Sequence, residues 1–152
     1  MKLGNSPAEE LPWEYDKKIR SVVQVSFAMV VIGSLQQISI TSPYVQALVL
    51  RCITALFILL ISTFFIRKTR YLFTDLKQEK WYILLSYFLW FLPFLSARFS
   101  SEIWSGVLFL WMISLYLEKD ISKRNIFLMG FLAAVSFLVR FQIAFALFGF
   151  FS

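Results

Sequence analysis

Long apolar runs, separated by short charged links, dominate this sequence of 152 residues. The runs cover approximately residues 21–41, 45–66, 81–97, 103–117 and 126–151. A stretch of about 20 apolar residues crosses a bilayer as a helix, because a helix satisfies its own backbone polar groups in lipid. The pattern therefore predicts an all-α fold, a polytopic membrane helix bundle with about four spanning helices. The run at 21–41 carries several glutamines and serines, so we expect it to span, to lie in the interface or to be re-entrant.

Composition supports a membrane protein and excludes several kinds of site. Hydrophobic residues make up 59% of the chain, above the roughly 45–50% of a soluble domain. The sequence has no histidine and one cysteine, Cys52, so we expect neither a metal site nor a cofactor. The formal net charge is +6, but the basic residues lie between apolar runs, as in cytoplasmic loops. We therefore expect no nucleic-acid partner.

The links divide the chain into two parts and predict its orientation. We expect residues 1–20 to be a polar N-terminal segment, the remnant of a lumenal or outer loop, and residues 21–152 to be a single transmembrane helical domain. Loops 67–80 and 118–125 together hold eight Lys and Arg, so the positive-inside rule places both in the cytoplasm. The short link 98–102 is then outside. We expect a multi-pass protein of the endoplasmic reticulum membrane in a eukaryote, or of the inner membrane in a bacterium.

One arginine stands inside the last apolar run. The stretch FLAAVSFLVRFQIAFALFGFF, residues 131–151, predicts a membrane helix that contains Arg140. An arginine at the centre of such a helix costs at least about 2.5–3.5 kcal/mol. Gly130, Ala133 and Ala144 share its helical face, so that face can pack closely against a neighbour. Two interpretations stay open: Arg140 snorkels or pairs within the bundle, or it faces a cavity that receives an anionic substrate.

Three short stretches, in this order, resemble parts of one family. WEYDKKIRS (13–21) is similar to a Trp-Glu-Trp…Ile-Arg-Ser stretch, and SARFSSE (96–102) to a Thr-Arg-Thr-Leu-Ser/Thr-Asn element after a membrane span. FLVRFQ (137–142) lies where the family carries an arginine in the next-but-one helix. The family is glycosyltransferase family 22, the lipid-linked-sugar-dependent mannosyltransferases of GPI-anchor and N-glycan assembly. The resemblance implies a partial GT-C architecture.

The resemblance also implies ligands and roles. The donor would be a polyprenyl-phosphate-linked sugar, and the acceptor a glycan or glycolipid. Arg98 and Arg140 would bind the donor phosphate with Glu102, although Arg98 alternatively anchors the interface or pairs with Glu102 at helical spacing. Ser100 and Ser101 are expected to cap a helix. The lumenal loop that shapes the acceptor site would include Trp13, Glu14 and Arg20, for which an amphipathic interfacial stretch is the alternative.

The sequence departs from the family at its catalytic signature. A His-Pro-Asp-Glu-like loop after a first membrane helix has no counterpart here, so no catalytic residue is assigned. We therefore expect an internal fragment of such an enzyme, inactive by itself, with a completing chain as its partner. The alternative is a small non-enzymatic membrane protein or lipid-binding subunit whose arginines contact phospholipid head groups.

Overall fold

The computed structural model describes residues 22–88, 97–118 and 122–151. The acceptor-loop prediction for Trp13, Glu14 and Arg20 therefore lies outside the described residues. The described parts are helical and contain no strand, which confirms the all-α prediction. The helices are α2 (Val22–Gln37), α3 (Pro43–Thr69), η2 (Arg70–Leu72), α4 (Leu76–Phe88), α6 (Ser101–Tyr116), α7 (Lys123–Val139), η3 (Phe141–Ile143) and α8 (Ala144–Phe151).

The starts of three helices follow from local chemistry. Pro43 occupies the first turn of α3, where a backbone N–H has no partner within the helix. The missing N–H of proline therefore costs no hydrogen bond there. Ser100 caps α6, because its Oγ accepts the backbone N–H of Ile103 at 3.5 Å. Ser122 caps α7 in the same way, by accepting the N–H of Asn125 at 3.3 Å. The expectation that Ser100 caps a helix is confirmed.

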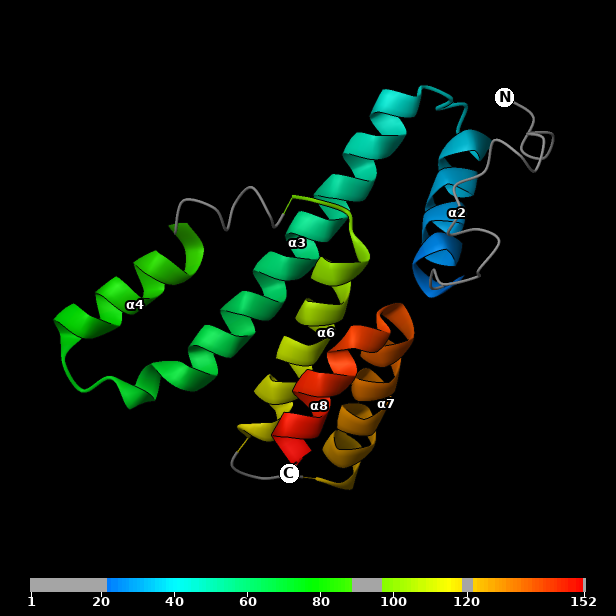
Figure 1. Ribbon diagram of the computed structural model, residues 1–152. Coiled ribbons are helices and arrows are strands. Elements are labelled where there is room, and N and C mark those ends of the chain that lie inside the picture. Colours follow the sequence, from blue (N-terminus) through cyan, green and yellow to red (C-terminus); the bar gives the residue numbers. More distant parts are fainter. Residues whose placement is uncertain (1–21, 89–96, 119–121, 152) are drawn as a thin grey trace.

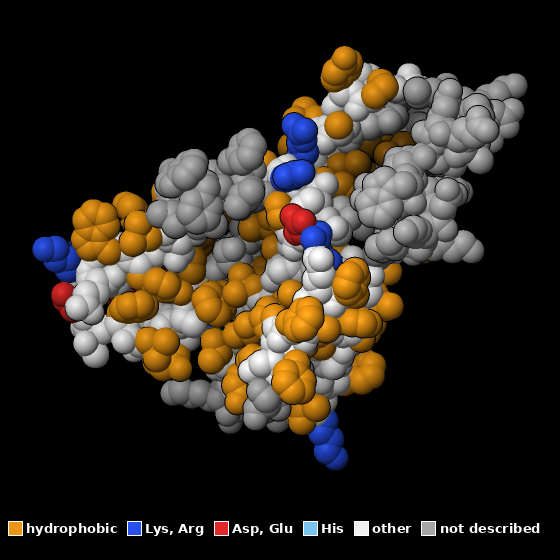
Figure 2. Space-filling view, in the orientation of Figure 1, with side chains coloured by type: hydrophobic (Ala, Val, Ile, Leu, Met, Phe, Trp, Pro, Cys, Tyr) orange, Lys and Arg blue, Asp and Glu red, His pale blue; other side chains and the backbone are white. Residues whose placement is uncertain are grey.

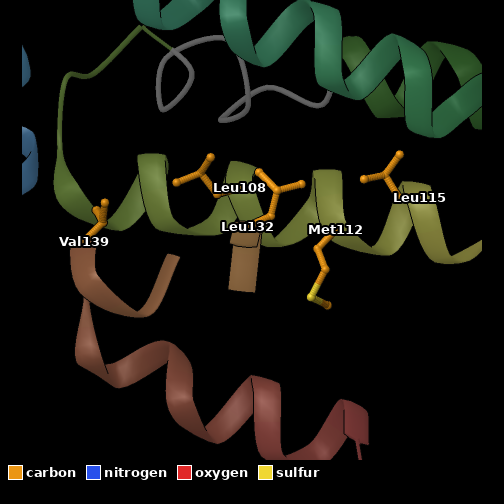
Figure 3. Close-up of a cluster of buried hydrophobic side chains, with 5 residues drawn as sticks. All are labelled: Leu108, Met112, Leu115, Leu132 and Val139. Carbon is orange, nitrogen blue, oxygen red and sulfur yellow. The ribbon is translucent and has the colours of Figure 1, made fainter. Parts of the chain in front are cut away.

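Helices α6 and α7 form the centre of the fold, with α3 on the other side of α6 (Figure 1). One cluster of buried apolar side chains comes from α6 and α7 (Figure 3). They are Leu108, Met112 and Leu115 from α6 and Leu132 and Val139 from α7. Helix α4 contacts the later part of α3, where the Tyr82 and Thr69 hydroxyls lie 2.7 Å apart. Helix α4 covers the described part of the predicted segment 81–97, and it begins five residues earlier, at Leu76.

Helix α3 is the strongest candidate to cross a membrane. Together with η2 it forms 30 helical residues, and an 18-residue stretch within them has a mean hydropathy of 2.4. At about 1.5 Å per residue, that length exceeds the roughly 30 Å of a hydrocarbon core. Within the described residues it is the only helix that is both long enough and apolar enough, so the number of spans stays a prediction. Much of the visible surface is hydrophobic (Figure 2).

The prediction of one continuous helix over 131–151 is wrong. Helix α7 ends at Val139, and Arg140 adopts extended backbone at φ −153° and ψ 112°. Helix α8 then turns back beside α6 (Figure 1), so that the Phe150 ring lies 5.1 Å from the ring of Tyr116. At this break the Arg140 side chain bonds to Glu102, at the start of α6, and to Gln142 of η3, although the apolar run itself is uninterrupted. Arg140 therefore stands at a helix end and not inside a helix.

Candidate functional site

A charged cluster joins the start of α6 to the break after α7. Arg140 Nη1 lies 2.7 Å from Glu102 Oε1, and Arg140 Nε donates a hydrogen bond of 2.6 Å to Gln142 Oε1. We call Glu102, Arg140 and Gln142 the Arg140 cluster. The side chain of Arg140 is 31% exposed and that of Glu102 is 61% exposed. The guanidinium is thus oriented by two acceptors while part of it stays accessible.

Local backbone structure places both ends of this ion pair. Glu102 lies in the first turn of α6, where a carboxylate is favoured by the helix dipole. The backbone N–H of Arg140 donates to Ser136 O at 3.1 Å and completes the last turn of α7. Its extended backbone then ends the helix, and η3 brings Gln142 within reach of the guanidinium.

A buried serine pair holds α6 and α7 close together one turn from the cluster. Ser136 Oγ donates to Ser105 O at 2.8 Å, and Ser105 Oγ donates to Ser136 O at 3.1 Å. Ser105 is 1% exposed and Ser136 is 0% exposed. Small residues allow two helix backbones to approach closely. The pair therefore fixes the separation of the helix ends that carry Glu102 and Arg140.

Arg98 lies at the same end of α6 but outside the ion pair. It precedes the capping residue Ser100 and is exposed. Its neighbour Phe99 stacks on Phe27 of α2, with ring centroids 6.4 Å apart. Glu102 pairs with Arg140, and no ion pair of Arg98 is found among the described residues. The sequence alternative of an Arg98–Glu102 pair is therefore wrong.

A third arginine belongs to this end of the bundle. Arg51 is exposed on α3, one turn before Thr54. The Trp104 indole N–H donates to Thr54 Oγ1 at 3.2 Å, which sets α3 beside the start of α6. Charged side chains gather there within a mostly hydrophobic surface (Figure 2). The sequence motifs assign no role to Arg51 or Gln142, although the position of Gln142 two residues after Arg140 is a usable signal.

The arrangement suits binding of an anion better than acid–base catalysis. A guanidinium binds carboxylate and phosphate oxygens with the same forked geometry. Arg51, Arg98 and Arg140 outweigh the single carboxylate of Glu102, so this end has a net charge of +2 from those four side chains. Among the described residues, no three His, Cys, Asp or Glu side chains are grouped so that they could hold a metal ion.

Comparison with known proteins gives one match. No curated protein and no solved structure matches the chain. The profile of the Alg9-like mannosyltransferase family matches residues 6–151, a range that includes all three stretches of the sequence resemblance. A match over nearly the whole chain establishes membership. The chain belongs to the Alg9-like mannosyltransferase family.

Proposed function

We propose that the Arg140 cluster, with Arg98, binds the phosphate of a polyprenyl-phosphate-linked mannose in a multi-pass membrane mannosyltransferase. Membership of the Alg9-like family supports a sugar donor and a glycan acceptor in general terms. The observation that carries the proposal is the 2.7 Å contact by which Glu102 holds Arg140 at the end of the bundle where Arg98 also lies.

The ion pair prepares Arg140 for the donor. Glu102 uses one nitrogen of the guanidinium and Gln142 another, so the side chain is held before a ligand arrives. An arginine offers five donors in a fixed plane, and those not used by Glu102 and Gln142 remain for phosphate oxygens. Arg98 adds a second cation with no ion pair among the described residues. The surplus positive charge offsets the repulsion between Glu102 and the phosphate.

The proposed orientation places this end outside or in the lumen. Helix α3 crosses the membrane, and the basic residues at its far end, Arg67 and Lys68, face the cytoplasm under the positive-inside rule. An apolar surface around the cluster suits the polyprenyl chain of the donor (Figure 2).

Transfer itself needs a base that we do not assign to this sequence. In our proposal a completing polypeptide supplies the acidic loop that activates the acceptor hydroxyl. The segment with Trp13, Glu14 and Arg20 then contributes to the acceptor side. This division makes donor binding, and not turnover, the activity to measure on the chain.

Donor binding by the purified chain in detergent tests the proposal. The probe is a short-chain polyprenyl-phosphate mannose, and the variants are Arg140→Leu and Arg140→Lys. Loss of a charge-assisted contact is worth about 1.5–3 kcal/mol, so we expect Arg140→Leu to weaken binding at least about tenfold. Arg140→Lys keeps the charge but loses the fork, so we expect an intermediate affinity.

Arg70→Leu provides the matched control, because Arg70 is exposed and lies at the opposite end of α3. We expect that variant to bind the donor as the unmodified chain does. Equal affinities for the Arg140→Leu and Arg70→Leu variants would overturn the proposal.

A further inference from the structure

A cleft of about 580 Å³ opens at the other end of the bundle, far from the Arg140 cluster. It lies between the last turn of α3, Leu117 and Glu118 just after α6, and the first turn of α7. Neither the sequence motifs nor the family match assigns a role to it. We call it the α3–α7 cleft.

One wall of the α3–α7 cleft is fixed by a fully bonded carboxylate. Lys68 Nζ donates to Glu118 Oε1 at 2.8 Å, and Asn125 Nδ2 donates to Glu118 Oε2 at 2.8 Å. Asn125 is 7% exposed, and its backbone N–H is bonded to the capping residue Ser122. Both oxygens of Glu118 are therefore occupied, and the charge of Lys68 is compensated within the fold.

Two further cations line the cleft. Arg67 and Arg124 are exposed, and neither has an ion pair or side-chain hydrogen bond within residues 22–88, 97–118 and 122–151. With Lys68 and Glu118 included, the described lining residues carry three positive charges and one negative charge, a net charge of +2. The positive end of the α7 dipole adds to this field. The cleft is therefore complementary to an anion.

The elements that form the cleft also carry exposed apolar side chains. Tyr71 and Leu72, at the end of α3, are 66% and 65% exposed. Ile126 and Phe127, in the first turns of α7, are 60% and 73% exposed. A basic hollow bordered by exposed apolar side chains matches an amphiphile whose head is anionic and whose tail is hydrocarbon.

We propose that the α3–α7 cleft is a second anion site, which binds a phosphate group through Arg67 and Arg124. A phospholipid head group and a free phosphate ion share this chemistry. The site does not depend on the function of the Arg140 cluster, because it lies at the opposite ends of α6 and α7.

Lipid retention by the full chain tests the site. The chain is purified in neutral detergent and mixed with phosphatidylglycerol, with phosphatidylcholine, or with inorganic phosphate, and bound species are counted by native mass spectrometry. Each basic residue near an anionic head group is worth a factor of about five, so we expect the double variant Arg67→Gln, Arg124→Gln to bind phosphatidylglycerol about 30-fold more weakly. Phosphatidylcholine binding should be weaker than phosphatidylglycerol binding and should not respond to the variant.

The control removes the same charge from the same end of the molecule. Lys77→Gln, Lys123→Gln alters two exposed residues that do not line the cleft, and we expect it to bind as the unmodified chain does. Arg67→Lys, Arg124→Lys should restore part of the affinity. If inorganic phosphate binds alone and depends on Arg67 and Arg124, the phosphate chemistry is supported and the source is the free ion. Equal losses in the test and control variants would reduce the effect to net charge and overturn the site.

Discussion

The serine pair between α6 and α7 offers the sharpest test of how the Arg140 cluster is positioned. Ser136→Ala removes the 2.8 Å bond to Ser105 O, and the 3.1 Å bond from Ser105 Oγ to Ser136 O can persist. Ser136→Leu removes the same bond and adds three carbon atoms at a site that is 0% exposed. The two substitutions therefore separate a lost hydrogen bond from a forced separation of the helices.

The expected magnitudes follow from the bonding of the pair. Ser136 O already accepts the N–H of Arg140 at 3.1 Å, so the carbonyl keeps a partner when the Ser105 hydroxyl is removed. Each alanine substitution should therefore cost about 0.5–1.5 kcal/mol, the net value of an ordinary hydrogen bond. Overpacking typically costs a further 1–3 kcal/mol. We expect Ser136→Leu to destabilise the chain by about 2–4 kcal/mol.

The assay is unfolding of the detergent-solubilised chain by sodium dodecyl sulfate, followed by circular dichroism. The alanine variants of Ser105 and Ser136, single and double, complete a thermodynamic cycle. Ser34→Leu is the control, because Ser34 is exposed on α2 and bonds only within its own helix. Donor binding is measured on the same proteins, and Ser136→Leu should lose it while Ser136→Ala keeps it. The reasoning fails if Ser136→Leu is no more destabilising than Ser34→Leu, since the site would then have room for the added atoms.

Two further outcomes follow from other contacts of α6. Trp104→Phe should lower the free energy of unfolding by about 0.5–1.5 kcal/mol. The substitution removes the 3.2 Å hydrogen bond to the buried Thr54 hydroxyl but keeps an aromatic ring beside Phe57. A chemical unfolding curve that matches the curve of the unmodified chain would contradict this prediction. The hydrogen bond from Lys68, with the nearby charges of Lys68 and Arg124, outweighs partial burial and holds the pKa of Glu118 below its ordinary value. The carboxylate therefore stabilises the fold fully above the pKa of an unfolded glutamate, about 4.3, and this stabilisation is lost as the pH falls through the lower folded pKa. As the pH falls through that range, the melting temperature of Glu118→Gln should fall less than that of the unmodified chain. If both proteins lose the same stability, Glu118 is not the cause of the acid dependence.

The positions of the helices were predictable because apolar runs and polar links alternate. A lipid or protein interior selects uninterrupted hydrogen-bonded backbone, so each run becomes a helix wherever its side chains permit. The capping role of Ser100 followed from its place before the run that becomes α6. The reversal after Val139 did not follow, because residues 131–151 contain no proline and only one glycine, Gly149. The ion pair that holds the Arg140 side chain at this break is made with Glu102 on α6. A local sequence pattern does not show a partner on another helix.

Two residues of the Arg140 cluster were named from the sequence, but their contacts were not, and their role in binding the donor stays a prediction. Both Arg140 and Glu102 were named from the resemblance, yet their 2.7 Å contact depends on α7 running back along α6. The proposed phosphate position between Arg98 and Arg140 stays a prediction. The α3–α7 cleft was missed altogether, because Lys68 and Glu118 are 50 residues apart and meet only when α3 packs on α6.

The two proposed anion sites should act independently, and the geometry of α6 explains why. Glu102 lies in the first turn of α6 and Glu118 just past its end, so about 16 residues at about 1.5 Å each separate them by roughly 24 Å. Two unit charges at that distance interact by only about 0.7 kcal/mol at an effective dielectric constant of about 20. A charge removed at one end therefore changes affinity at the other by a factor of about three or less, against the tenfold or larger effects expected within each site. The Arg140→Leu variant should consequently retain phosphatidylglycerol at the α3–α7 cleft, and the Arg67→Gln, Arg124→Gln variant should retain donor binding. A loss of both ligands in either protein would show instead that α6 and α7 move as a unit and couple the two ends.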